Sequence, residues 1–270
     1  MAYLQVNFFS EALDRKTTFH ALIPIDHWKG RDVGRNERPA PLKSLYLLCG
    51  YSGDEMDWIH YSTVRSLSEQ YNVAVFMPEG GNFFYLDDVE KGECFGAFIG
   101  KELVEYTRKL FPLSVNREDT WIGGLSMGGY GALRNGLKYA ETFGRIIALS
   151  SALITYRIAG RNGDTAVDGR DVRYFRRVFG DLDRVLGSDK DPEALVLKLK
   201  EAKASLPRIY MACGTEDFLL DVNRRFRDFL MKENVEFVYE EGPGEHSWDF
   251  WNKTLKSGLR WALGNSELDG

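Results

Sequence analysis

The hydrophobic pattern of the chain consists of short runs rich in apolar, β-branched or aromatic residues. Eight such runs, each of strand length, cover residues 4–9, 18–23, 44–49, 73–77, 120–122, 145–149, 208–212 and 235–239. From the third run onward they alternate with segments of helical character at residues 56–70, 95–110, 130–139, 219–232 and 248–263. This alternation predicts an α/β fold, with a mostly parallel sheet covered by helices on both faces.

Two departures from the alternation refine this prediction. The first two runs are joined by a polar turn at residues 11–16, which predicts an antiparallel hairpin at the sheet edge. Residues 151–205 are polar and rich in arginine, without linker composition on either side. We therefore expect a single domain over residues 1–270, with an insertion over the sheet at about 151–205.

Composition narrows the classes of partner. The chain has 270 residues, 44% of them hydrophobic, enough for one large core. A formal net charge of -5 disfavours nucleic acid and anionic membranes, and no apolar run approaches the roughly 20 residues that span a bilayer. We expect a small-molecule substrate and no nucleic-acid or membrane partner, while the composition is compatible with a homo-oligomer.

Cysteine usage and the N-terminus favour a cytoplasmic location. Cys49, Cys94 and Cys213 are far apart and form no CxxC pair, which argues against a disulfide framework and a structural zinc site. The first residues carry early acidic side chains and no sustained apolar core, unlike a secretory signal.

The stretch GGLSMGGYGAL directly follows the run at 120–122 and centres on Ser126. The pattern Gly-x-Ser-x-Gly also arises by chance in a chain with 27 glycines, so its context decides. A strand, a turn too sharp for side chains and then a helix would expose Ser126 as a nucleophile, with Gly124 and Gly128 where a Cβ would clash. The alternative is a tight turn that only packs the helix on the strand.

A serine nucleophile needs a base, and the chain has four histidines. His20 lies within an early strand, His27 in the following polar loop and His60 in a predicted helix, where structural roles are expected. His246 lies in GPGEHSW, between the last predicted strand and the last helix. That loop belongs to the same carboxyl edge of the sheet as Ser126, so His246 is the candidate base.

The base needs a carboxylate that orients it. Asp217 lies in CGTED, directly after a predicted strand, while Glu216 and Asp221 are alternatives that would merely cap the next helix. The chain order Ser126, Asp217, His246 is that of α/β-hydrolases, with each residue following one of the late strands.

The reaction also needs donors for a developing oxyanion. Met127 follows the serine and would supply one backbone N–H. Tyr51 lies between Gly50 and Gly53 after a predicted strand and would supply the second. The two glycines could instead simply make a turn.

Several of these motifs together resemble the esterase D-like α/β-hydrolases. This group includes S-formylglutathione hydrolases, tributyrin-type acetyl esterases, feruloyl and acetylxylan esterases, and mycolyltransferases. The matching stretches, between about residues 45 and 251, are LLCGYSGDEMDW, MPEGGNFFYLDD, WIGGLSMGGYGAL, CGTEDFLLDVNRRF and EHSWDFW. They are most similar to the bacterial tributyrin esterase branch.

The resemblance implies an α/β-hydrolase fold and a serine esterase active on short acyl esters, from acetyl to butyryl, through an acyl-enzyme without metal or cofactor. The site residues it implies are Ser126, Asp217 and His246 as the triad, with the N–H groups of Tyr51 and Met127 as the oxyanion hole. Cys49 stands where many relatives have the histidine of an HG pair, which removes any side-chain role for that position. The alternatives are an S-formylglutathione hydrolase and a catalytically silent binding module.

Two features bear on the substrate. Phe83, Phe84 and Tyr85 lie after a predicted strand and could be pocket walls or core. Six arginines between residues 156 and 178 are half balanced by aspartates, which indicates a solvated face or an oligomer contact, with an anionic-substrate clamp as the alternative. These arginines are Arg157, Arg161, Arg170, Arg173, Arg176 and Arg177.

Overall fold

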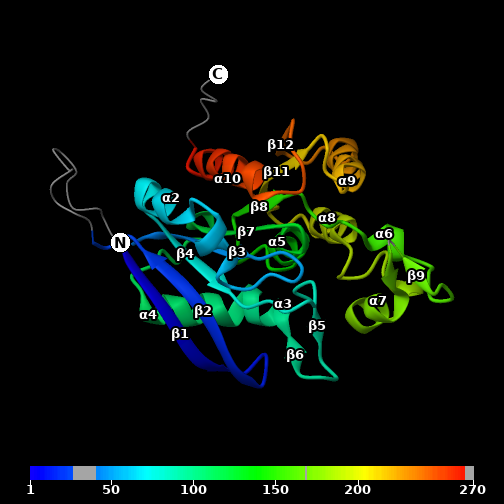
Figure 1. The fold of residues 1–270 in the computed structure, drawn as a ribbon, viewed down its shortest axis with the longest axis horizontal. Coiled ribbons are helices and arrows are strands. Elements are labelled where there is room, and N and C mark those ends of the chain that lie inside the picture. The colour runs from blue at the N-terminus through cyan, green and yellow to red at the C-terminus, as the bar shows by residue number, and fades with distance from the viewer. Residues whose placement is uncertain (27–40, 168, 265–270) are drawn as a thin grey trace.

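An eight-stranded sheet forms the centre of the molecule (Figure 1). The structure is a computed structural model that describes residues 1–26, 41–167 and 169–264. The strands lie in the order β1-β2-β4-β3-β7-β8-β11-β12. Their bounds are β1 (Ala2–Ser10), β2 (Arg15–Ile23), β3 (Lys43–Leu48), β4 (Val73–Pro78), β7 (Thr120–Leu125), β8 (Arg145–Leu149), β11 (Arg208–Gly214) and β12 (Phe237–Gly242).

The strand directions agree with the sequence pattern. β1 pairs antiparallel with β2, and β2 antiparallel with β4, so the N-terminal hairpin lies at one edge of the sheet. The remaining pairs, from β4 through β12, are all parallel. All eight predicted strands are confirmed, with ends shifted by a few residues, and so is the predicted edge hairpin.

Helices cover both faces because the strand side chains alternate between two cores. On β4, Val75 and Met77 join the cluster under α1 (Asp57–Tyr61), α2 (Val64–Tyr71) and α10 (Trp248–Ala262). Ala74 and Phe76 join the cluster of the opposite face. That face carries α4 (Leu103–Leu110), α5 (Met127–Lys138) and α9 (Leu220–Lys232).

Three predicted helices differ in detail from the observed ones. The segment 56–70 is not one helix, because Ser62 is extended and its Oγ accepts from the Val64 N–H, which ends α1 and begins α2. The segment 95–110 contains α3 (Phe95–Ala97), a π-helical turn and then α4. The helix predicted at 130–139 begins earlier, at Met127, directly after the serine.

Residues 151–205 leave the sheet after β8 and form several short elements beside it (Figure 1). These are α6 (Thr155–Ile158), β9 (Ala166–Val167), β10 (Arg170–Asp171), α7 (Val172–Phe179) and α8 (Pro192–Glu201), with a 3-10 turn before α8. Their buried side chains, including Phe175 and Val196, belong to the same cluster as α5. This shared core supports the prediction of an insertion in a single domain, which stays a prediction.

The turn between β7 and α5 is packed too closely for side chains at two glycines. A Cβ on Gly128 would lie 2.4 Å from the Leu48 carbonyl oxygen and 2.5 Å from that of Cys49. A Cβ on Gly124 would lie 2.5 Å from the Gly128 carbonyl oxygen. The predicted clash at both positions is confirmed, and it arises because α5 starts directly against the end of β3.

We expect Gly128→Ala to lower the free energy of unfolding by at least about 2 kcal/mol, because backbone atoms must move to admit the methyl group. Gly163→Ala is the matched control, since a Cβ there meets nothing within 4 Å. Its effect should stay within about 0.5 kcal/mol. Urea unfolding of both variants measures the difference, and equal stabilities would contradict the close approach of α5 to β3.

Candidate active site

A cavity of about 220 Å³ lies where parallel strands end. Its lining comes from the segments that follow β3, β4, β7, β8 and β11, because the carboxyl ends of parallel strands share one edge of the sheet. The lining residues are Tyr51, Phe84, Ser126, Met127, Ala152, Ile154, Arg157, Arg170, Tyr174, Phe175, Phe218 and Leu219. The cavity is therefore mainly apolar and aromatic, with one serine hydroxyl and two arginines.

Ser126 occupies a strained turn between β7 and α5. Its φ of 55° and ψ of -117° are unusual for a residue with a side chain. The conformation is held on both sides, because the Ser126 N–H donates to the Leu149 carbonyl at 2.9 Å and its carbonyl accepts from the Ala152 N–H at 2.9 Å. The turn directs the hydroxyl into the cavity, as the nucleophile interpretation requires.

His246 joins Ser126 and Asp217 in one hydrogen-bonded chain. Its Nε2 lies 3.0 Å from Ser126 Oγ, and its Nδ1 lies 2.9 Å from Asp217 Oδ2. The imidazole packs edge-on against Trp251, with ring centroids 4.9 Å apart, and also contacts Phe218 at 4.6 Å. The three residues named from the sequence thus meet although they lie far apart along the chain.

The environment of Asp217 assigns the proton on His246. The Asp217 side chain is fully buried, and this desolvation acts to raise its pKa. The hydrogen bonds from His246 and from the Leu219 N–H outweigh that cost, so the pKa of Asp217 is lowered and the carboxylate stays ionised near neutral pH. An ionised carboxylate can only accept hydrogen bonds, so Nδ1 of His246 carries the proton. Nε2 then presents its lone pair to Ser126 Oγ.

The two alternative carboxylates bind other groups. Glu216 accepts from the Gly244 N–H at 2.6 Å and so anchors the loop that carries His246. Asp221 lies in the first turn of α9 and forms an ion pair with Arg157. Neither side chain caps α9. At the start of that helix, the Leu219 N–H donates to the Asp217 carboxylate instead.

The other described histidines lie away from Ser126. His20 is buried in β2, where its Nδ1 lies 2.6 Å from the Tyr3 hydroxyl and its ring stacks on the Tyr3 ring. His60 is exposed on α1. The structural roles expected for these two agree with their positions, whereas His27 lies outside the described residues.

Two backbone N–H groups beside Ser126 have no acceptor among the described residues: those of Tyr51 and Met127. Met127 is the first residue of α5, where an N–H has no partner inside the helix. The loop of Tyr51 passes close to the serine, since a Cβ on Gly50 would lie 3.6 Å from Ser126 Cβ. Unpaired donors at this position are what an oxyanion needs.

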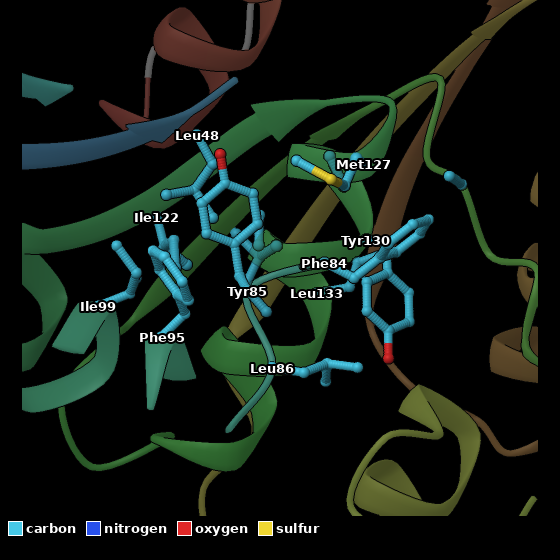
Figure 2. Packing of buried hydrophobic residues seen from close by; sticks show 14 of the residues in the cluster. Leu48, Phe84, Tyr85, Leu86, Phe95, Ile99, Ile122, Met127, Tyr130 and Leu133 are labelled. Atoms are coloured by element: carbon cyan, nitrogen blue, oxygen red, sulfur yellow. The ribbon is translucent and has the colours of Figure 1, made fainter. Parts of the chain in front are cut away.

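Only one of the three predicted aromatic walls lines the cavity. Phe84 does so and packs against Tyr130, with ring centroids 5.3 Å apart. Phe83 instead stacks on Phe95 at 5.7 Å. Tyr85 is fully buried and points in another direction from Phe84, toward Leu48 at the end of β3 (Figure 2). Successive side chains of this loop diverge, so sequence proximity did not place them on one wall.

Tyr85 supports the loop that carries Tyr51, a contact that the sequence did not reveal. Its hydroxyl donates to the Cys49 carbonyl at 3.1 Å and lies 3.2 Å from the Cys49 thiol. Burial raises the pKa of Cys49 to about 12, so this thiol stays protonated. Tyr85 and Phe84 both have positive φ, near 55°, a strain the surrounding core sustains.

The arginine-rich segment divides into two groups. Arg161 and Arg173 are exposed and form ion pairs with Asp164 and Asp171, as expected of a solvated face. Arg157 and Arg170, by contrast, line the cavity that contains Ser126. The exposed, paired Arg161 and Arg173 agree with the solvated-face interpretation, whereas the cavity position of Arg157 and Arg170 agrees with the alternative, an anionic-substrate clamp.

Two further searches concern metal ions and membranes. In the described ranges, no group of three or more His, Cys, Asp or Glu side chains is arranged to hold a metal ion. No helix in the same ranges is long and apolar enough to cross a bilayer.

Comparison with known proteins identifies relatives over nearly the whole chain. Residues 10–262 match the model of the family described as "Putative esterase". An acetyl esterase of Caldicellulosiruptor saccharolyticus is 52% identical over 261 residues, which cover 97% of this chain and 98% of that protein.

Solved structures of similar fold include two from Staphylococcus aureus. One is the fluorophosphonate-binding serine hydrolase FphF with bound substrate, and the other is the S-formylglutathione hydrolase FrmB without ligand. Each has a TM-score of 0.81 and 27% identity, covering 97% of this chain and 98% of the other. The predicted α/β-hydrolase fold is confirmed by these serine hydrolases.

Proposed function

This chain belongs to the esterase family whose model it matches, and from that premise we propose that Ser126 is the nucleophile of an esterase that cleaves short-chain acyl esters, from acetyl to butyryl. The observation that carries the proposal is the hydrogen-bonded chain from Ser126 Oγ through His246 to Asp217. The 52% identical relative, an acetyl esterase, supports the small acyl group.

The geometry supports an acyl-enzyme mechanism in two halves. Ser126 Oγ attacks the ester carbonyl carbon while His246 Nε2 takes the hydroxyl proton, and Asp217 stabilises the imidazolium through Nδ1–H. The C–O bond to the alcohol then breaks, and the alcohol leaves with the proton from His246. Water repeats the sequence on the acyl-serine and releases the carboxylic acid.

The oxyanion formed in each half would be bound by the N–H groups of Tyr51 and Met127. A preorganised donor of this kind is worth about 2.7–4 kcal/mol of transition-state stabilisation. Tyr85 fixes the first donor indirectly, because its hydroxyl holds the carbonyl of Cys49, two residues before Tyr51. No metal or cofactor is needed, since the developing charge is met by these donors.

The cavity size favours small acyl groups. Its volume of about 220 Å³ lies below the roughly 300–1,000 Å³ of pockets for drug-sized ligands. The apolar lining residues Phe84, Ala152, Ile154 and Phe175 are all buried and suit a short aliphatic chain.

The second candidate is an S-formylglutathione hydrolase, favoured by the 27% identity to FrmB. The same triad would cleave its thioester. Comparing kcat/KM for acetyl, butyryl and octanoyl esters with that for S-formylglutathione separates the two functions. A catalytically silent module would hydrolyse none of them and would not react with a fluorophosphonate.

The proposal also includes a small-molecule partner without nucleic acid or membrane, a cytoplasmic location and a possible homo-oligomer. The formal charge of -5 supports the expectation that neither nucleic acid nor an anionic membrane is a partner. The separated cysteines support the cytoplasmic location.

Replacing the nucleophile tests the proposal most directly. Ser126→Ala should lower kcat by a factor on the order of 10⁶, because no covalent intermediate can form. The variant should have the same Tm as the parent and should not be labelled by a fluorophosphonate. The parent should be labelled when it is folded and not after denaturation. Turnover within a few-fold of the parent would reject Ser126 as the nucleophile.

The carboxylate assignment is tested by three matched amide substitutions. Asp217→Asn should lower kcat by a factor on the order of 10⁴, because an amide can favour the wrong tautomer of His246. Glu216→Gln and Asp221→Asn should have much smaller effects, since these side chains bind Gly244 and Arg157 instead. If Asp221→Asn were the damaging change, the orienting residue would have been misassigned.

The role of Tyr85 is tested by removing its hydroxyl alone. Tyr85→Phe should lower kcat by about tenfold with KM nearly unchanged, because the Cys49 carbonyl loses its donor and the oxyanion loop shifts. Affinity for a trifluoromethyl ketone, which mimics the tetrahedral intermediate, should fall in parallel.

Tyr130→Phe is the control for Tyr85, since Tyr130 is also fully buried but its hydroxyl donates to the Lys190 carbonyl at 2.5 Å. This variant should lose stability while its kcat stays near that of the parent. Similar losses of kcat in both variants would mean that Tyr85 acts only through packing.

A further inference from the structure

The charged groups in the cavity lining are both cationic. Arg157 and Arg170 line it together with Ser126, and the other lining residues are apolar, aromatic or backbone contributors. The chain as a whole has a formal charge of -5. Arg157 is already paired with Asp221, so Arg170 supplies the positive charge of the lining that no described carboxylate balances. A positive group in the cavity of an acidic protein indicates a preference for anionic ligands.

Arg170 is held by aromatic stacking. Its guanidinium carbon lies 3.8 Å from the centre of the Tyr51 ring and 5.9 Å from that of Tyr174. The two rings meet edge to face at 5.6 Å, and the Tyr174 hydroxyl is fixed by a 2.8 Å hydrogen bond to the Asn82 carbonyl. Stacking uses the face of a guanidinium and leaves its N–H donors, which lie in the plane, available at the edge.

Three of the other five arginines in this segment have carboxylate partners, whereas no carboxylate partner is found for Arg170 in the described part of the chain. Arg157 pairs with Asp221, Arg161 with Asp164 and Arg173 with Asp171. Arg170 therefore has a fixed position over the ring of Tyr51, whose N–H is a proposed oxyanion donor, and no described carboxylate binds its side-chain N–H groups.

From this arrangement we propose that Arg170 recognises an anionic group on the substrate, and that the preferred substrates are short-chain acyl esters whose alcohol portion carries a carboxylate. The inference rests on the proposed esterase function. The alcohol side is chosen because the buried apolar lining residues suit the acyl chain, whereas Arg170, also a lining residue, is exposed to solvent. A carboxylate matches the planar fork of a guanidinium with two parallel hydrogen bonds.

Two acetate esters that differ only in charge test the proposal: 3-acetoxybenzoate and its neutral counterpart 3-acetoxybenzamide. The parent should show the higher kcat/KM with 3-acetoxybenzoate, after correction for the rates of alkaline hydrolysis of the two esters. Arg170→Gln should lower kcat/KM for 3-acetoxybenzoate by about tenfold and leave that for 3-acetoxybenzamide within about twofold. Added NaCl should reduce the parent's preference, because the group is exposed.

Arg173→Gln is the matched control, since it removes an exposed arginine of the same segment that is paired with Asp171. It should leave the ratio of the two kcat/KM values unchanged. Arg170→Lys keeps the positive charge but loses the planar guanidinium fork. Its ratio of kcat/KM for 3-acetoxybenzoate to that for 3-acetoxybenzamide should therefore lie between those of the parent and Arg170→Gln.

The outcomes separate this inference from the proposed function. Equal losses for both esters in Arg170→Gln, or a parent that does not distinguish them, would overturn the anion-recognition role while leaving the esterase proposal intact. If the parent hydrolysed neither 3-acetoxybenzoate nor 3-acetoxybenzamide, the esterase proposal would be overturned, and this inference with it.

Discussion

The close contact between the start of α5 and the end of β3 is the constraint on which the site depends. Gly128 lies so near the carbonyls of Leu48 and Cys49 that no side chain fits between them. This approach brings the loop after β3, with Tyr51, next to the turn that carries Ser126. Because Ser126 in the same turn is bonded to Leu149 at the end of β8, the turn after β7 contacts the ends of both neighbouring strands, β3 and β8.

The buried contacts around that turn explain how the strain is sustained. Ser126, Phe84 and Tyr85 all have positive φ, a conformation that costs free energy in residues with a Cβ. Each is held by more than one contact. Ser126 has two backbone hydrogen bonds, and Phe84 packs against Tyr130 and Phe179. The Tyr85 hydroxyl donates to the Cys49 carbonyl, and its own carbonyl accepts from the Asn135 side chain. A loop that is held on several sides keeps its donors in place before the substrate arrives, which is the condition for electrostatic stabilisation of an oxyanion.

The insertion at residues 151–205 adds what the sheet cannot supply. The strands and their loops provide Ser126, His246 and the N–H groups of Tyr51 and Met127, whereas Arg170, Tyr174 and Phe175 come from the insertion. Its interior is continuous with the core under α5, so these side chains are mounted on packed elements. Because the reacting groups lie on the sheet loops and part of the cavity wall lies on the insertion, a change in the insertion can alter substrate preference without altering the reaction.

The sequence by itself determined the strands, their mostly parallel direction and the grouping of Ser126, Asp217 and His246. Hydrophobic periodicity and strand-end position are local signals, and parallel strands end at a common edge. The sequence did not determine the break between α1 and α2, where a serine hydroxyl bonds the backbone, or which of Phe83, Phe84 and Tyr85 faces the cavity. It also did not separate Arg170 from the paired arginines near it. Only the tertiary structure decided these points, because they depend on which partners arrive from distant segments: the Cys49 carbonyl for Tyr85, and the Tyr51 ring for Arg170.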